Sequence, residues 1–143
     1  VSGPVIAEMV REAGYEVVWQ KVLPDDQTML EEAMTEICDE GKADLILTTG
    51  GTGFSPRDVM PEATLAVAER MVPGIPEAMR AYSLQFTKRA MLSRAASGIR
   101  KRTLIVNLPG SPKAVRECLE YILPQLEHGL KILLGLDGEC ARK

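Results

Sequence analysis

The sequence predicts an α/β protein, a three-layer α/β/α sandwich with a mostly parallel sheet. Apolar stripes of helical period alternate along the chain with short strand-like runs, without an internal repeat. Two of these runs, 45–47 and 103–106, are continuously apolar, which is typical of strands covered on both faces. Each of the two leads into a glycine-containing loop and then a helix start. The 143 residues fit a single domain over 1–143.

Composition excludes several classes of protein. Apolar residues make up 45% of the chain and charged residues 26%, which is ordinary for a globular domain. The net charge of −3 argues against a nucleic-acid partner. No apolar run has transmembrane length and no signal peptide is evident, so we expect a cytoplasmic protein without a membrane partner. Three scattered cysteines without a C-x-x-C pair indicate a reducing compartment and argue against zinc.

The first third of the chain reads as helix, strand, helix, strand. Ser2 can cap a first helix, which Gly14 ends. The β-branched and aromatic residues of Tyr15–Leu23 predict a strand. Asp26 caps a second helix that runs to about Glu40. The strand over 43–49 follows.

The rest of the chain continues the alternation. A third helix starts at Pro61-Glu62, and the proline-rich run 72–76 ends it. The later elements are a helix over 77–86, two apolar runs over 91–99 and 103–108, and a helix over 111–123. The two apolar runs flank a basic turn and either form a hairpin or lie in a mixed sheet. Pro124 starts or kinks a last helix that ends near Gly135, and we expect 136–143 to be loosely ordered.

The loop after the strand over 43–49 is the first candidate site. It reads Thr49-Gly50-Gly51-Thr52-Gly53. Glycines allow a sharp turn and a close approach of ligand to backbone, and successive N–H groups can form an anion-binding concavity. The loop lacks the Gly-Lys-Ser/Thr of a Walker A motif and the third glycine of a dinucleotide fingerprint. The glycines alone fit a tight connection or a phosphate site.

The second candidate loop runs from Asn107 to Ser111. Ser111 is a good N-cap and Pro112 a good first helical residue, so the loop is a helix start, an anion site, or both.

Asp25 and Asp58 follow strand ends; they serve as turn and cap residues or as carboxylates for Mg²⁺. His128 is the only histidine and lies in the last predicted helix, which disfavours a Ser-His-Asp hydrolase.

The motifs together resemble one known family. Thr48 to Thr64 reads Thr-Thr-Gly-Gly-Thr-Gly-x-x-x-Arg-Asp-Val-x-Pro-Glu-Ala-Thr, which is similar to the signature of the molybdopterin adenylyltransferases. These include MogA-type bacterial enzymes and gephyrin G domains, within the MoaB/MogA superfamily. Asn107–Ser111 resembles their second motif, and Leu23–Asp26 and Ser2–Pro4 match as well. The resemblance extends from Ser2 to about Gly135 and implies a molybdopterin-binding-like fold.

The resemblance implies a reaction in molybdenum cofactor biosynthesis. Molybdopterin and ATP, with Mg²⁺, give adenylylated molybdopterin and pyrophosphate. Asp25 and Asp58 correspond to the family's catalytic aspartates and are our candidate Mg²⁺ ligands. The candidate substrate- and nucleotide-binding residues are Ser2, Gly3, Thr49, Gly50, Gly51, Thr52, Gly53, Asn107, Pro109, Gly110 and Ser111. The resemblance also implies a homotrimer, or a hexamer as in MoaB-type relatives.

One departure from the family and three alternatives stay open. Family members begin with a central strand and a loop bearing Ser-Asp, whereas this sequence opens on the first helix, so we expect a truncated N-terminus and a gap in the sheet. The main alternative is a MoaB-type protein that binds molybdopterin without efficient adenylylation; the Asn-Leu-Pro-Gly-Ser form is more MogA-like. The others are a scaffold, for which the sequence offers no linker or second domain, and the nucleotide-hydrolysing domain of competence-damage proteins.

Overall fold

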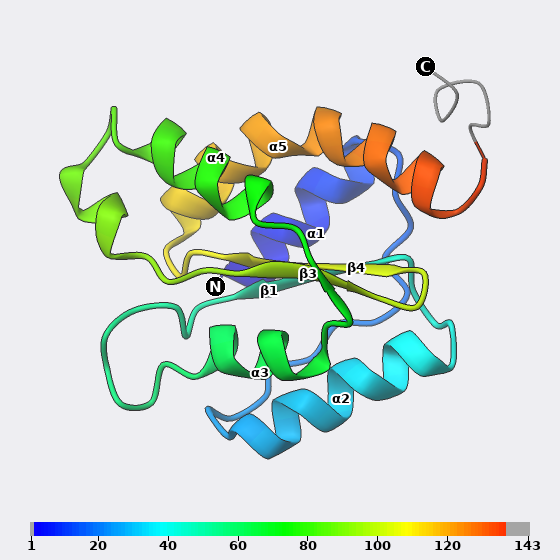
Figure 1. The fold of residues 1–143 in the computed structure, drawn as a ribbon. Coiled ribbons are helices and arrows are strands. Elements are labelled where there is room, and N and C mark those ends of the chain that lie inside the picture. The colour runs from blue at the N-terminus through cyan, green and yellow to red at the C-terminus, as the bar shows by residue number, and fades with distance from the viewer. Residues whose placement is uncertain (1, 137–143) are drawn as a thin grey trace.

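A central sheet lies between two layers of helices in the computed structural model, which describes residues 2–136 (Figure 1). The elements are, in chain order, α1 (Ser2–Glu12), α2 (Gln27–Asp39), β1 (Leu45–Thr49), α3 (Met60–Val67), β2 (Arg70–Met71), α4 (Gly74–Ser83), the 3₁₀ helix η1 (Lys88–Leu92), β3 (Ser97–Arg100), β4 (Thr103–Leu108) and α5 (Pro112–Leu133). Helices α1, α4 and α5 cover one face of the sheet, and α2 and α3 cover the other. The predicted α/β/α layering is confirmed.

The described strands form a mixed sheet in the order β1-β4-β3-β2. Only β1 and β4 pair in parallel; β4 with β3 and β3 with β2 are antiparallel, so the expectation of a mostly parallel sheet is wrong for these strands. For β3 and β4 the reason is the short connection over 101–102, because two residues can join only antiparallel neighbours. The two runs thus form a hairpin, and this hairpin lies in the mixed sheet, so both of the open alternatives hold. Strand β2 has two residues, too few for a sequence pattern.

The predicted strand Tyr15–Leu23 is not formed. The chain there contains no strand and passes beside β1, and a groove of about 1690 Å³ is lined by both segments. Val22 is 95% exposed and Trp19 is 49% exposed. β-branched and aromatic residues favour an extended backbone, but a strand also needs a neighbour to hydrogen-bond. No described strand pairs with this segment or with the outer edge of β1.

The helices follow the predicted stripes with some shifts. Asp26 caps α2 as predicted, accepting a hydrogen bond from the Met29 N–H at 3.1 Å. Helix α4 begins at Gly74, inside the predicted break, and the start of the predicted run 91–99 is the 3₁₀ helix η1. Helix α5 continues through Pro124 as one element, held by buried side chains on both sides of the proline. The expectation for 137–143 lies outside the described residues.

Two apolar clusters fix the helices on the sheet. The larger is formed mainly by α1, α5 and β4 and includes Val106, Val115 and Leu119, which are fully buried. The smaller lies between α2, α3 and β4 and includes Ile105. Cys38 and Cys118 are free thiols within these clusters, as expected of core fillers. No described helix is long and apolar enough to cross a bilayer.

Candidate functional site

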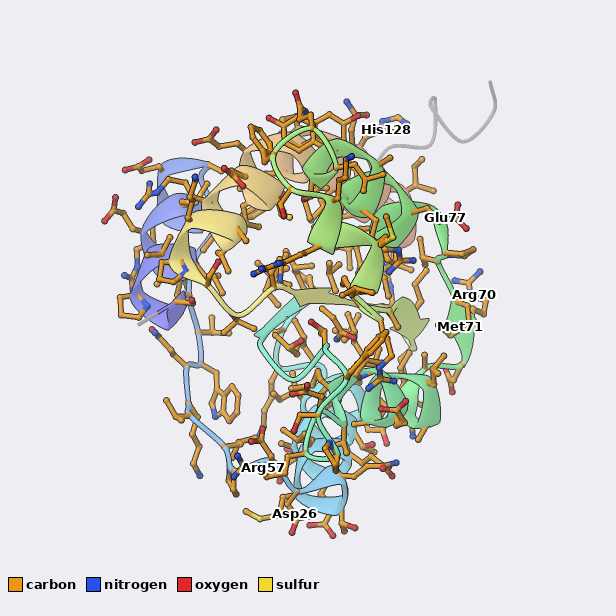
Figure 2. The ribbon with its side chains drawn as sticks, turned by 90° about the vertical axis from the view of Figure 1, so that its left-hand side faces the viewer. Asp26, Arg57, Arg70, Met71, Glu77 and His128 are labelled. Atoms are coloured by element: carbon orange, nitrogen blue, oxygen red, sulfur yellow. The ribbon has the colours of Figure 1, made fainter. Side chains whose placement is uncertain are left out.

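The two glycine-containing loops leave the sheet side by side. Strands β1 and β4 are parallel neighbours with Thr49 opposite Leu108, so both end at the same edge. Figure 2 views the molecule from this side. The Gly50 N–H donates to the Leu108 carbonyl at 3.2 Å. A Cβ on Gly110 would lie 3.5 Å from the Gly50 Cα, so the two loops are in contact. The two candidate loops therefore lie in contact at one edge of the sheet.

Two hydroxyl groups hold the second loop. The Thr49 hydroxyl donates to the Pro109 carbonyl at 2.6 Å, and the Ser2 hydroxyl donates to the Gly110 carbonyl at 2.6 Å. Ser2 is buried at the start of α1. Both residues were predicted to bind ligand. In the structure their hydroxyls connect the second loop to β1 and to α1. They fix the position of the loop from which α5 starts.

The loop between β1 and α3, residues 50–59, is called the glycine loop; within the described residues it leaves a row of amide groups without hydrogen-bond partners. Gly50 and Gly51 have φ values of +84° and +70°, which other residues rarely adopt. The carbonyls of Gly51, Thr52 and Gly53 accept hydrogen bonds from the scaffold. Within residues 2–136, no acceptor faces the N–H groups of Gly51, Thr52, Gly53 and Phe54. Successive unpaired N–H groups of this kind form an anion-binding concavity.

Asp58 shapes the end of the glycine loop. Its Oδ2 accepts from the Ser55 N–H at 2.9 Å, and its own N–H donates to the Ser55 carbonyl at 2.9 Å. A Cβ on Gly53 would lie 2.9 Å from the same Oδ2, so glycine is needed there. Asp58 is half-buried, and its Oδ1 accepts no hydrogen bond within the described part of the chain. One carboxylate oxygen thus remains for a cation or a substrate.

Asp25 is exposed at the rim of the groove beside β1. It lines that groove together with Gly3, Thr49, Gly50 and Gly51. Figure 2 places its neighbour Asp26 and the glycine-loop residue Arg57 toward the same end of the molecule. No hydrogen bond of the described residues joins Asp25 to Asp58. Among residues 2–136 no three acidic, histidine or cysteine side chains gather for a metal, so a cation here would also need ligand oxygens.

Ser111 begins α5 as predicted. Its Oγ accepts from the Ala114 N–H at 3.2 Å, and Pro112 is the first helical residue. The positive end of the helix dipole therefore lies beside the glycine loop, where Gly110 contacts Gly50. Both features favour an anion at the same edge of the sheet.

Asn107 lies beneath the loops and is fully buried. Its Nδ2 donates to the hydroxyls of Thr48 and Thr64 at 3.0 and 2.8 Å, and its Oδ1 accepts from the Ala96 N–H at 3.0 Å. These bonds join β4 to β1, to α3 and to the residue before β3. Asn107 was predicted to bind ligand; in the structure its side chain is engaged by protein on every side and supports both loops from below.

Two important residues, Arg94 and Glu62, were not among the site residues predicted from the sequence. Arg94, between η1 and β3, binds the glycine loop through its side chain and its backbone N–H. Its guanidinium pairs with Glu62 on α3, with Nη1 2.6 Å from Oε2. The hydrogen bond from Arg94 lowers the pKa of Glu62, and Glu62 in turn raises the pKa of Arg94. A lone arginine far along the chain from the loop shows no motif spacing, so only the fold brings it there.

Fold and site together define a class. A glycine loop with unpaired amides, beside a helix N-terminus at the carboxyl ends of parallel strands, is typical of α/β proteins that bind phosphorylated ligands. Residues 1–128 match the family described as "Probable molybdopterin binding domain". The chain belongs to this molybdopterin-binding family, which confirms the family predicted from its motifs.

Relatives and solved structures agree with this assignment. The chain is 41% identical over 137 residues to a molybdopterin adenylyltransferase of Helicobacter pylori, covering 94% of this chain and 78% of that protein. It is 52% identical over 102 residues to the Escherichia coli molybdopterin adenylyltransferase, covering 71% of this chain and 52% of the relative. The chain thus spans about half the length of that E. coli relative.

Among solved structures, the molybdopterin biosynthesis enzyme MoaB from Thermus thermophilus superposes with a TM-score of 0.87 at 45% identity, covering 94% of this chain and 84% of that one. The molybdopterin biosynthesis Mog protein from Mycobacterium ulcerans gives a TM-score of 0.86 at 39% identity, covering 92% of this chain and 86% of that one. The molybdopterin-binding fold predicted from the motifs is confirmed.

Proposed function

We propose that the protein adenylylates molybdopterin in molybdenum cofactor biosynthesis, with ATP as co-substrate. The observation that carries the proposal is the row of unpaired N–H groups from Gly51 to Phe54 beside the N-terminus of α5. Relatives such as those of Helicobacter pylori and E. coli are named for this activity.

The proposed reaction is a nucleotidyl transfer. The terminal phosphate oxygen of molybdopterin forms a bond to the α-phosphorus of ATP, the bond from that phosphorus to the bridging oxygen breaks, and pyrophosphate leaves with the electron pair. The amides of Gly51, Thr52 and Gly53 bind phosphate oxygens and reduce the repulsion between the negative charges of the two reacting phosphate groups. The rigid loops keep the two reactants in line, so catalysis is mainly positioning and charge stabilisation.

Asp58 and Asp25 are the residues we propose for a bound Mg²⁺. The free Oδ1 of Asp58 fits this role, and Mg²⁺ typically takes one or two carboxylates plus substrate phosphates. Such an ion, when bound, would neutralise charge developing on the phosphates. Gly3, Gly50, Pro109, Gly110 and Ser111 complete the walls that we assign to pterin and nucleotide.

We also propose that the protein is cytoplasmic and assembles as a homotrimer. Free Cys38 and Cys118 suit a reducing compartment. Apolar side chains around α4 and η1 are exposed in the single chain, at Leu84, Phe86, Met91 and Leu92. Another copy could cover such a surface. Sedimentation equilibrium would distinguish a trimer from a hexamer or a monomer.

Replacing Asp58 with asparagine tests the proposed catalytic role. Asp58→Asn keeps the acceptor for the Ser55 N–H but removes the negative charge. We expect turnover to fall by about 100-fold or more, with molybdopterin affinity far less affected. Pyrophosphate release measures the turnover, and a direct titration measures the affinity.

Asp44→Asn is the matched control, because Asp44 is exposed at the opposite, amino end of β1. Its turnover should equal that of the wild type. Equal turnover of Asp58→Asn and the wild type would refute the role of Asp58. Pterin binding without any ATP-dependent product would instead favour the MoaB-type alternative, which the names of the Helicobacter pylori and E. coli relatives do not favour.

A further inference from the structure

Arg94 makes a set of contacts that the reaction scheme does not use. Its Nε donates to the Gly53 carbonyl at 2.8 Å, and its Nη2 donates to the Asp58 carbonyl at 2.6 Å. Its backbone N–H donates to the Thr52 carbonyl at 2.9 Å. One residue from outside the loop therefore binds three carbonyls of the segment that runs from the first glycines to Asp58.

Glu62 holds the guanidinium in this position. Its Oε2 accepts from Nη1 at 2.6 Å and its Oε1 from Nη2 at 3.4 Å. Glu62 lies in the first turn of α3, the helix that the glycine loop leads into. The planar fork of arginine has donors in fixed directions, so one side chain can serve Glu62 and two carbonyls at once. A lysine ammonium on a flexible stem cannot reproduce this geometry.

The contacts of Arg94 determine which groups of the loop are left for ligand. Each bond from Arg94 to the loop engages a carbonyl, while the N–H groups of Gly51, Thr52, Gly53 and Phe54 donate no hydrogen bond among the described residues. A peptide unit has its C=O and N–H on opposite sides. The Arg94 backbone anchors the Thr52 carbonyl and the Arg94 side chain anchors the Gly53 carbonyl, which sets the direction of the N–H groups of Gly53 and Phe54.

We propose that Arg94, held by Glu62, is a positioning residue that orients the N–H groups of Gly53 and Phe54 in the glycine loop toward the phosphate of the substrate. The expected effect on kcat rests on the proposed adenylyl transfer. The positioning of the loop by Arg94 does not depend on that proposal. Arg94 acts through the loop carbonyls, which it contacts directly.

A second arginine provides a matched control. Arg100 also pairs with a carboxylate by two bonds, to Asp39 at 2.9 and 3.0 Å, and donates to the Val67 carbonyl at 3.0 Å. Its side chain is 23% exposed, against 35% for Arg94. Arg100 ends β3 beside the 101–102 turn, at the edge of the sheet away from the glycine loop. Arg100→Met removes the same kinds of bond without touching that loop.

The kinetic test compares Arg94→Met, Arg94→Lys and Arg100→Met in the full chain, with molybdopterin, ATP and Mg²⁺. We expect kcat to fall roughly 100-fold in Arg94→Met, because misplacing groups by about 1 Å has effects of this size. Arg94→Lys keeps the charge but not the fork, and we expect it to stay at least about tenfold below the wild type. Arg100→Met should keep the wild-type kcat, although its melting temperature falls about as much as that of Arg94→Met.

Amide hydrogen exchange tests the loop independently of activity. The N–H groups of Asp58 and Met60 bond to the Ser55 and Gly51 carbonyls within the loop. We expect their exchange to accelerate roughly tenfold or more in Arg94→Met, since each bond to a charged donor stabilises the closed loop. In Arg100→Met their exchange should match the wild type.

Measuring both kcat and amide exchange distinguishes a failure of the proposed function from a failure of the positioning role of Arg94. If the wild type forms no product but exchange accelerates only in Arg94→Met, the proposed function fails and the positioning of the loop by Arg94 stands. If the wild type is active and Arg94→Met keeps its kcat, the positioning role is overturned. Unchanged exchange of Asp58 and Met60 in Arg94→Met would overturn it as well.

Discussion

The buried Asn107 network allows a sharp test of how the two loops are supported. Asn107→Leu keeps a similar side-chain volume but removes three hydrogen bonds, to Thr48, Thr64 and Ala96. Each bond contributes about 1 kcal/mol net, and the buried Ala96 N–H left without an acceptor costs about 1–3 kcal/mol more. We therefore expect the free energy of unfolding to fall by about 4–6 kcal/mol.

Urea denaturation of the full chain measures this loss, and Thr64→Val serves as the graded comparison. Valine replaces a fully buried hydroxyl with a methyl group and removes one of the three bonds, so it should lower the free energy of unfolding by about 1 kcal/mol. A loss below about 1 kcal/mol in Asn107→Leu would refute the structural reasoning. Unchanged stability with lost molybdopterin binding would make Asn107 a ligand contact, as the sequence predicted.

Three further substitutions test the site and the fold. Gly53→Ala puts a Cβ 2.9 Å from the Asp58 Oδ2, so steady-state kinetics should show kcat reduced by about 100-fold; a wild-type kcat would contradict this. In Glu62→Gln the stability deficit should depend on pH, because the Arg94 hydrogen bond lowers the pKa of Glu62. The contribution of the carboxylate is complete above its ordinary pKa of 4.5 and is lost as the pH falls through the lower folded value, so the difference in denaturation midpoint should vanish in acid. A pH-independent difference would argue against the ion pair. Gly98→Ala brings a Cβ within 2.5 Å of the Ala68 Cβ and 2.9 Å of the Arg70 carbonyl, and it should cost about 1–3 kcal/mol by thermal unfolding. Its control is Gly129→Ala in α5, where the added Cβ meets nothing within 4 Å; equal melting temperatures of the two variants would contradict the packing account.

Much of the fold could be predicted because local patterns and tertiary packing agree. The apolar runs before the two loops form β1 and the fully buried β4, as continuous apolar runs suggest. The segment Tyr15–Leu23 shows the limit of such patterns. Its residues favour extended backbone, but strand formation depends on a partner that no local pattern reveals. The short strand β2 depends on pairing with β3 in the same way.

The candidate site was predictable where its residues share a loop. Gly50 to Gly53 and Asp58 lie in one segment, and the parallel pairing of β1 and β4 brings Gly110 and Ser111 beside it. Arg94 could not be found this way, because it reaches Gly53 across 41 residues of sequence. The supporting role of Asn107 also depends on contacts with Thr64 on another element.

The most direct test of the proposed function is product analysis by mass spectrometry. The full chain is incubated with molybdopterin, ATP and Mg²⁺, and each reactant is omitted in turn. The account predicts adenylylated molybdopterin and pyrophosphate in equal amounts, and neither product when ATP or molybdopterin is left out. Unmodified molybdopterin after complete incubation, with or without hydrolysis of ATP, would contradict the proposed adenylyl transfer.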